Sequence, residues 1–196
     1  QKTSEAGRLY RQAIASNLQE PASLHPVIRR VLLARGIGDK TSLDLKLKRL
    51  HAPGSLSGID KAAEILADAL VGDESILIVG DFDADGATGS AVAVRGLRSM
   101  GARNVDFRVP DRFEFGYGLS VALVNTFQDD PPDVLVTVDA GISSIEGVER
   151  ALGLGCKVIV TDHHLPGDVL PAADAIVNPN CPGDDFPSKS LAGVGG

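Results

Sequence analysis

The chain has 196 residues, of which 43% are hydrophobic and 23% are charged, and its formal net charge is −7. This length suits one domain with a small appendage, and the composition excludes an intrinsically disordered chain. No apolar run approaches the roughly 18 residues of a membrane-spanning helix, so no membrane partner is expected.

Cysteine usage and the ends of the chain indicate its context. Cys156 and Cys181 lie far apart and form no Cys-x-x-Cys pair, which indicates neither a disulfide framework nor a thiolate zinc site. With no signal-peptide pattern, a reducing, cytoplasmic setting is expected. The chain starts at Gln1 instead of Met and stops in a glycine-rich stretch, so we expect a fragment of a longer protein.

The first part of the chain is basic and is predicted to contain short helices. Residues 1–50 hold 10 Lys/Arg and 4 Asp/Glu, whereas residues 51–196 hold 9 and 22. Pro26 suits a first helical position, Gly36 suits a helix end, and Thr41 and Asp44 have capping-box spacing for another helix. We expect a helical, basic N-terminal arm over residues 1–52, which either binds a polyanion or presents a solvated face.

From residue 53 onward the pattern is that of an α/β domain. A helix is predicted over 59–71, and further helices near 87–100, 119–128 and 143–154. Short Val/Ile/Leu runs, typical of strands buried on both faces, occur at 76–79, 105–109, 134–138, 158–160 and 175–177. The alternation predicts an open, mostly parallel sheet of about five strands flanked by helices, in one domain over residues 53–196.

Acidic residues and histidines follow three of these strands directly. The first strand leads into Asp81, Asp83 and Asp85, the third into Asp139, and the fourth into Asp162-His163-His164. Open parallel sheets bind ligands outside the carboxyl ends of their strands, so these residues are expected at one edge.

The alternating aspartates favour a cation site. In an extended segment Asp81, Asp83 and Asp85 would face the same way and raise one another's pKa unless a cation compensates. The alternative for the aspartates is a purely structural one, an acidic turn in which Asp85 caps the next helix. The alternative for the two histidines is a hydrogen-bonded pair that only stabilises the fold. Mixed Asp/His ligands suit Mn²⁺ or Mg²⁺, and a pair of such ions can clamp a phosphoester during hydrolysis.

These motifs resemble the DHH phosphoesterase superfamily, named for the Asp-His-His triplet. The resemblance is carried by residues 76–88, 109–119, 136–144, 158–167 and 186–195, and it is weakest over residues 1–40. It is closest to a bacterial branch that removes nucleotides from the 5′ end of single-stranded DNA in repair and recombination. For that branch it implies a monomer with Mn²⁺ or Mg²⁺, and single-strand-binding protein and a helicase as partners.

The resemblance also implies residue roles. Asp83, Asp85, Asp139 and His163 match metal ligands, and Asp81 matches a first acidic position that is either a ligand or lies behind one. His164 matches a histidine near the scissile phosphate, and Asp162 is expected to orient a histidine. Family members have a further metal-binding Asp and a second lobe after the region that this chain covers.

The loop over residues 110–118 supplies candidate substrate contacts. Arg112 is expected to meet a phosphate and Tyr117 to stack on a base. The structural alternative is an Arg112–Glu114 pair with the aromatic residues packing the loop. Two other functions stay open: a phosphodiesterase for short oligonucleotides or cyclic dinucleotides, and a non-catalytic nucleic-acid-binding module.

Overall fold

The computed structural model describes residues 25–37 and 46–195, which form two units divided after His51. The first unit contains helix α2 (Pro26–Ala34) and a 3₁₀ turn at Leu47–Arg49. Proline begins α2 because its fixed φ suits the first turn, and His25 caps the helix by accepting from the amide of Val27. The helix predicted around Thr41 and Asp44 lies outside the described residues. None of the helices in the described ranges is long and apolar enough to span a bilayer.

The second unit is an α/β domain. Its helices are α3 (Ile59–Gly72), α4 (Ala84–Ser99), α5 (Arg112–Phe115), α6 (Val121–Asn125) and α7 (Ile145–Gly153), with 3₁₀ turns at Pro53–Ser55 and Gly193–Gly195. Its strands are β1 (Ile76–Gly80), β2 (Val105–Arg108), β3 (Val134–Val138), β4 (Lys157–Thr161) and β5 (Ala175–Val177). They form one five-stranded sheet in the order β2-β1-β3-β4-β5, and every pair is parallel. The predicted open parallel sheet flanked by helices is confirmed.

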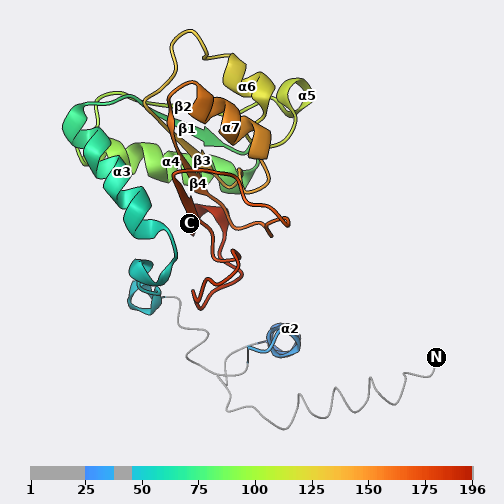
Figure 1. Cartoon of the computed structure of the whole chain (residues 1–196). Coiled ribbons are helices and arrows are strands. Elements are labelled where there is room, and N and C mark those ends of the chain that lie inside the picture. Colours follow the sequence, from blue (N-terminus) through green and yellow to red (C-terminus); the bar gives the residue numbers. More distant parts are fainter. Residues whose placement is uncertain (1–24, 38–45, 196) are drawn as a thin grey trace. The chain divides into compact units, whose positions relative to one another are not determined.

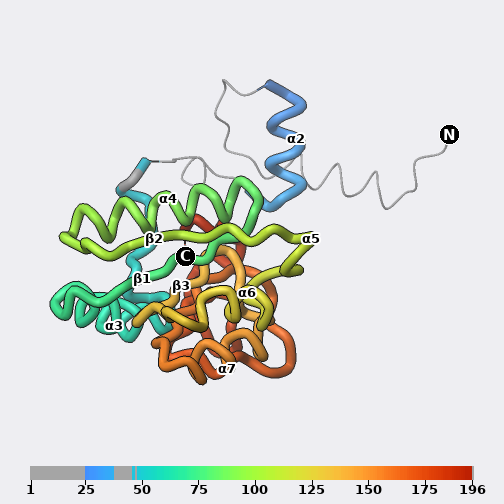
Figure 2. The backbone as a smooth tube through the Cα atoms, turned by 90° about the horizontal axis from the view of Figure 1, so that it is seen from above, coloured from blue at the N-terminus to red at the C-terminus, as the bar shows by residue number. Residues whose placement is uncertain are grey.

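Two apolar layers cover the sheet. One layer packs α3 and α4 against residues such as Ile76 and Ile78, and the other packs α6 and α7 against Leu77 and Val79 (Figure 1). All residues of β1 and β3 are buried, as expected for central parallel strands with helices on both faces. Strand β2 lies at one edge beside α4 and leads toward α5 (Figure 2).

Strand order places the acidic loops. The chain passes from β1 to β2 on one side of β1, whereas β3 pairs on the other side, so the strand order reverses between β1 and β3. Gly80 and Val138 are partners at the carboxyl ends of these two strands. Asp81 and Asp139 follow directly and therefore flank the crevice at this topological switch point.

Three helices differ from the prediction, and a side-chain cap sets the first residue of each. Helix α4 begins at Ala84, since the Asp83 carboxylate accepts from the amides of Asp85 and Gly86. The expected extended run of alternating aspartates, and the alternative in which Asp85 is the cap, are therefore both wrong. Asp111 caps α5 by accepting from Phe113, within the segment that we expected to be a loop. The helix predicted over 119–128 is shorter, at Val121–Asn125.

The contact of α7 with the preceding segment gives a stability prediction. A Cβ on Gly147 would overlap the carbonyl of Leu119, whereas a Cβ on Gly153, at the end of the same helix, meets nothing within 4 Å. Gly→Ala normally stabilises a helix by about 0.5–1 kcal/mol. We expect Gly153→Ala to raise the free energy of unfolding by up to that amount and Gly147→Ala to lower it by about 1–3 kcal/mol, as overpacking does. Urea unfolding of both variants tests this, and a stabilising Gly147→Ala would contradict it.

Candidate functional site

The loop after β1 carries three carboxylates in different environments. Asp81 is buried, and its Oδ1 accepts from the amide of Phe82 at 2.8 Å. Asp83 is exposed, and its Oδ1 accepts from the amides of Asp85 and Gly86, each at 3.0 Å. The Gly86 hydrogen bond is the main cause that lowers the pKa of Asp83, so this carboxylate is ionised at neutral pH.

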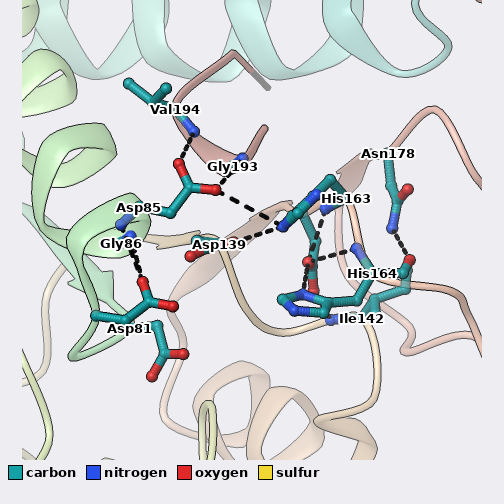
Figure 3. A network of polar contacts seen from close by, with 12 residues as sticks. Asp81, Asp85, Gly86, Asp139, Ile142, His163, His164, Asn178, Gly193 and Val194 are labelled. Atoms are coloured by element: carbon teal, nitrogen blue, oxygen red, sulfur yellow. Dashed lines mark hydrogen bonds and ion pairs between the residues drawn. The ribbon is translucent and has the colours of Figure 1, made fainter. Parts of the chain in front are cut away.

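Asp85 joins this loop to a distant part of the chain. Its Oδ2 accepts from the amide of Gly193 at 2.8 Å, and its Oδ1 accepts from that of Val194 at 3.1 Å. The same Oδ2 lies 3.9 Å from Nε2 of His163. Figure 3 shows Asp85 between the 3₁₀ turn at Gly193–Gly195 and the histidine.

Asp139 is at the centre of the cluster. Its side chain is 2% exposed, and its Oδ1 lies 2.9 Å from Nε2 of His163 without forming a hydrogen bond. Burial is the main cause that raises the pKa of Asp139 to about 6, and the charges of Asp85 and Asp83 contribute to the same rise. Its backbone φ is 60°, a left-handed conformation that is uncommon outside glycine and often marks functional sites.

Asp162 forms hydrogen bonds with both residues of the histidine pair. Its buried Oδ1 accepts from the amides of His163 at 2.7 Å and of His164 at 3.0 Å, and from Nδ1–H of His164 at 2.7 Å. Its Oδ2 accepts from the amide of Ile142 at 2.9 Å. Burial lowers the pKa of His164, but the hydrogen bond and charge of Asp162 more than offset this, and the net pKa is raised.

The geometry of these groups fits a cation. Ligand atoms of Asp81, Asp83 and Asp139 lie within 4.8 Å of one another, and so do those of Asp139, His163 and His164. Asp139 belongs to both groups, and its buried Oδ1 has no hydrogen-bond partner. A buried carboxylate oxygen without a donor is costly unless a positive charge compensates it. The oxygen and imidazole donors suit Mn²⁺ or Mg²⁺.

The predicted substrate residues lie beside the acidic loop. The guanidinium of Arg112 lies 3.7 Å from the ring centroid of Phe82, and its Nη2 lies 4.0 Å from Oδ2 of Asp81. The ion pair of Arg112 is thus with Asp81 rather than with Glu114, and Phe113 is fully exposed instead of packing the loop.

The hydroxyl of Tyr117 lies 3.4 Å from both ring nitrogens of His164, which is long for a hydrogen bond. Burial and then the charges of Asp162 and Asp81 raise the pKa of Tyr117 to about 12. Its hydroxyl therefore stays protonated at neutral pH and remains a hydrogen-bond donor beside the histidine.

Two asparagines at the site were not predicted. Asn178 and Asn180 follow β5 and donate to the carbonyls of His164 and His163. Their position after a strand was the available signal, because the same position identified Asp139 and the histidine pair. Phe82, which contacts Arg112, was also missed, since a cation–π contact between the loop after β1 and helix α5 leaves no local pattern.

Comparison with known proteins identifies the family. A model described as the DHH family, N-terminal domain, matches residues 75–195. The chain belongs to the DHH family. The predicted resemblance to DHH phosphoesterases is confirmed, and the family domain begins one residue before β1 and contains all the carboxylates and histidines of the site.

Two curated relatives of this DHH chain are named single-stranded-DNA-specific exonuclease RecJ. The protein from Escherichia coli (strain K12) is 50% identical over 188 residues, which is 96% of this chain and 33% of the relative. The protein from Bacillus subtilis (strain 168) is 38% identical over 183 residues, which is 91% of this chain and 23% of the relative. This chain thus spans about a third or less of these proteins.

Two solved structures resemble the DHH chain. Exonuclease RecJ bound to manganese has a TM-score of 0.67 and 38% identity, over 74% of this chain and 37% of that one. RecJ from Thermus thermophilus in complex with Mn²⁺ has a TM-score of 0.65 and 33% identity, over 95% of this chain and 25% of that one.

Proposed function

We propose that this chain is the DHH part of a metal-dependent exonuclease that degrades single-stranded DNA from its 5′ end to mononucleotides. The observation that carries the proposal is Asp139, a buried carboxylate between the acidic loop and the histidine pair whose Oδ1 forms no hydrogen bond and lies 2.9 Å from Nε2 of His163. The names of the relatives, single-stranded-DNA-specific exonucleases, support the substrate class. The proposed setting is DNA repair and recombination in the cytoplasm.

The proposed metal ligands are Asp83, Asp85, Asp139 and His163, with Mn²⁺ or Mg²⁺ as the ion. Two similar structures, both of RecJ with manganese, support this choice. Asp85 already accepts two backbone hydrogen bonds, but a carboxylate offers about four lone-pair sites and can keep these bonds while it binds a cation.

The bound ions would supply Lewis-acid activation of water and neutralisation of the phosphodiester charge. The other residues prepare the site for that chemistry. Asp162 accepts the Nδ1 proton of His164, and its charge helps to raise the pKa of that imidazole. The protonated ring can then stabilise negative charge that develops on the phosphate. Asp81 is proposed to hold Arg112 over the loop, where the guanidinium can meet a phosphate.

Turnover is expected to depend on the proposed ligands. Asp83→Asn keeps an oxygen to cap α4, and His163→Ala removes only a partly exposed ring, so both variants should fold. We expect kcat to fall more than about 100-fold in each, beyond the usual effect of residues that only support a ligand. The exposed Asp68 on α3 gives the control variant Asp68→Ala, with unchanged turnover. Normal turnover in either ligand variant would contradict the assignment.

The substrate is tested with the complete natural protein. Single- and double-stranded oligonucleotides labelled at either end are incubated with Mn²⁺, Mg²⁺ or EDTA, and the products are resolved by length. We expect metal-dependent release of mononucleotides from the 5′ end of single strands only. Activity confined to very short substrates would indicate a small-substrate phosphodiesterase, and inactivity with every metal would indicate a binding module.

Arg112 gives a separate prediction about substrate binding. Arg112→Ala is expected to raise KM for single-stranded DNA about tenfold, because a guanidinium–phosphate contact contributes roughly 1.5–3 kcal/mol. The matched control is Arg103→Ala, since Arg103 is 81% exposed and pairs with Asp73 away from the carboxyl edge. Steady-state kinetics on one oligonucleotide measure both, and equal KM values for the two variants would exclude a phosphate contact by Arg112.

A further inference from the structure

The main chain of the histidine pair lies beyond the sheet. Strand β4 ends at Thr161, so the sheet ladder no longer fixes the peptide groups of His163 and His164. Both of their N–H groups donate to Oδ1 of Asp162, at 2.7 and 3.0 Å. One carboxylate therefore fixes the donor side of this short segment.

The acceptor side is fixed from a different loop. Nδ2 of Asn180 donates to the carbonyl of His163 at 2.6 Å, and Nδ2 of Asn178 donates to the carbonyl of His164 at 3.0 Å. Figure 3 shows the Asn178 amide directed at this carbonyl. All four polar main-chain groups of the two histidines thus have side-chain partners, and the rings project from a backbone held on both sides.

The asparagine loop is itself held in place. Asn178 is 1% exposed, and its Oδ1 accepts from the amide of Asn180 at 2.8 Å. Nζ of Lys189 donates to the carbonyl of Pro179 at 2.6 Å and to that of Asp184 at 2.7 Å. The buried carboxylate of Asp184 accepts from the amide of Ser57, just before α3, at 2.8 Å. The asparagines therefore belong to a network anchored in the body of the domain.

We propose that Asn178 and Asn180 are positioning residues, each of which fixes the position of one histidine ring by holding its main-chain carbonyl. Asn180 fixes the backbone that directs His163 at Asp139, and Asn178 fixes the backbone that presents His164 beside Tyr117. This inference rests on the proposed function for its kinetic consequences, but the effect on ring position is independent of any reaction. Because Oδ1 of Asn178 also accepts from the amide of Asn180, loss of the Asn180 side chain should affect His163 alone, whereas loss of the Asn178 side chain should affect both histidines.

The variants remove the donor without changing side-chain size. Asn180→Leu and Asn178→Leu are nearly isosteric and lack the amide donor, whereas Asn180→Asp keeps the oxygen and also adds a charge. The matched control is Asn104→Leu, because Nδ2 of Asn104 donates to the carbonyl of Asp73 at 3.1 Å, at the other edge of the sheet. Asn180 is only partly buried, so its variants test the proposal even if the Asn178 variant fails to fold.

The experiment combines spectroscopy of the metal-free protein with Mn²⁺ titration and kinetics, on the complete natural protein labelled with ¹⁵N-histidine. Asn180→Leu should shift the ring signals of His163 and weaken Mn²⁺ affinity about 10–100-fold, the usual range for a residue that supports a ligand. Asn178→Leu should shift the ring signals of His164 and, through the amide of Asn180, those of His163. It should lower kcat about 10–100-fold and weaken Mn²⁺ affinity less than Asn180→Leu does. Asn180→Asp should shift the same His163 signals.

Two results would overturn the proposal. One is unchanged ring signals in both leucine variants, and the other is an equal loss of kcat in Asn104→Leu, which would indicate general destabilisation. A wild-type protein that neither binds Mn²⁺ nor degrades DNA would refute the proposed function instead. The ring signals of the metal-free protein would then still decide the positioning role.

Discussion

Asp139→Asn is expected to abolish DNA cleavage and at the same time to stabilise the metal-free protein. The cleavage loss, more than about 100-fold, follows from removing the carboxylate shared by both candidate ligand groups. Asparagine is the appropriate replacement because it keeps the size of the side chain and, apart from glycine, is among the residues that best tolerate the φ of 60° at this position. The stabilisation follows from the buried charge that the variant no longer carries.

The pH dependence of this stabilisation has a defined sign. The folded-state pKa of Asp139 is raised from 3.8 to about 6, mainly by burial and then by Asp85 and Asp83. Between these values the folded state binds more protons than the unfolded state, so the free energy of unfolding falls as the pH rises. The destabilisation of the wild-type protein by the Asp139 charge is absent below about pH 4 and complete above about pH 6. Two pKa units correspond to roughly 3 kcal/mol, the upper limit of the expected gain.

Urea unfolding in EDTA at pH 4 and pH 7.5 measures this effect. Asp139→Asn should unfold at higher urea than wild type at pH 7.5, and the difference should shrink at pH 4. Asp68→Asn, at an exposed position on α3, should match wild type at both values. A variant that is inactive but no more stable at pH 7.5 would show that Asp139 is compensated in the metal-free protein.

Asp162→Asn is expected to lower both stability and activity. Oδ1 of the buried carboxylate accepts from two histidine amides and one histidine ring, and Oδ2 accepts from the amide of Ile142. In asparagine one of these two oxygens becomes an NH₂ group, which cannot accept, so the donors on that side lose their acceptor. Each buried donor left without an acceptor costs about 1–3 kcal/mol. We expect kcat to fall about 10–100-fold, because the orientation of His164 is lost.

This variant also has a pH signature. Asp162 raises the pKa of His164 in the folded protein. A histidine of this kind makes its full contribution to the free energy of unfolding when the pH is below the pKa that it has in the unfolded chain. That contribution is lost as the pH rises through the folded pKa. The stability difference between wild type and Asp162→Asn should therefore be larger at pH 5.5 than at pH 8.5, in urea unfolding with EDTA.

The control for Asp162 is Asp133→Asn. Oδ2 of Asp133 accepts from the amide and hydroxyl of Ser75 at the amino end of β1, each at 2.8 Å. This variant should lose stability without losing kcat, because Asp133 is a hydrogen-bonded carboxylate far from the carboxyl edge. If both variants kept full kcat per folded molecule, the orienting role of Asp162 would be wrong.

The sequence by itself determined the sheet and the aspartates and histidines that gather at its carboxyl edge. Short apolar runs separated by helical patterns predicted the positions of all five strands. The expected burial on both faces is wrong for β2, which lies at the edge of the sheet and is buried only at Val105. Because carboxyl ends of parallel strands share an edge, Asp81, Asp139 and His163 could be placed together from their positions alone. The motifs over residues 76–88, 109–119, 136–144, 158–167 and 186–195 together carried the family resemblance.

Only the tertiary structure decided how each side chain of the site is used. The hydrogen bond between Asp85 and Gly193 joins residues 108 positions apart, and the bonds from Asn178 and Asn180 cross from β5 to the segment after β4. Local periodicity carries no information on such pairs, because they depend on strand order. The burial and the neighbouring carboxylates of Asp85 and Asp83 that raise the pKa of Asp139 likewise come together only when β1, β3 and β4 are side by side.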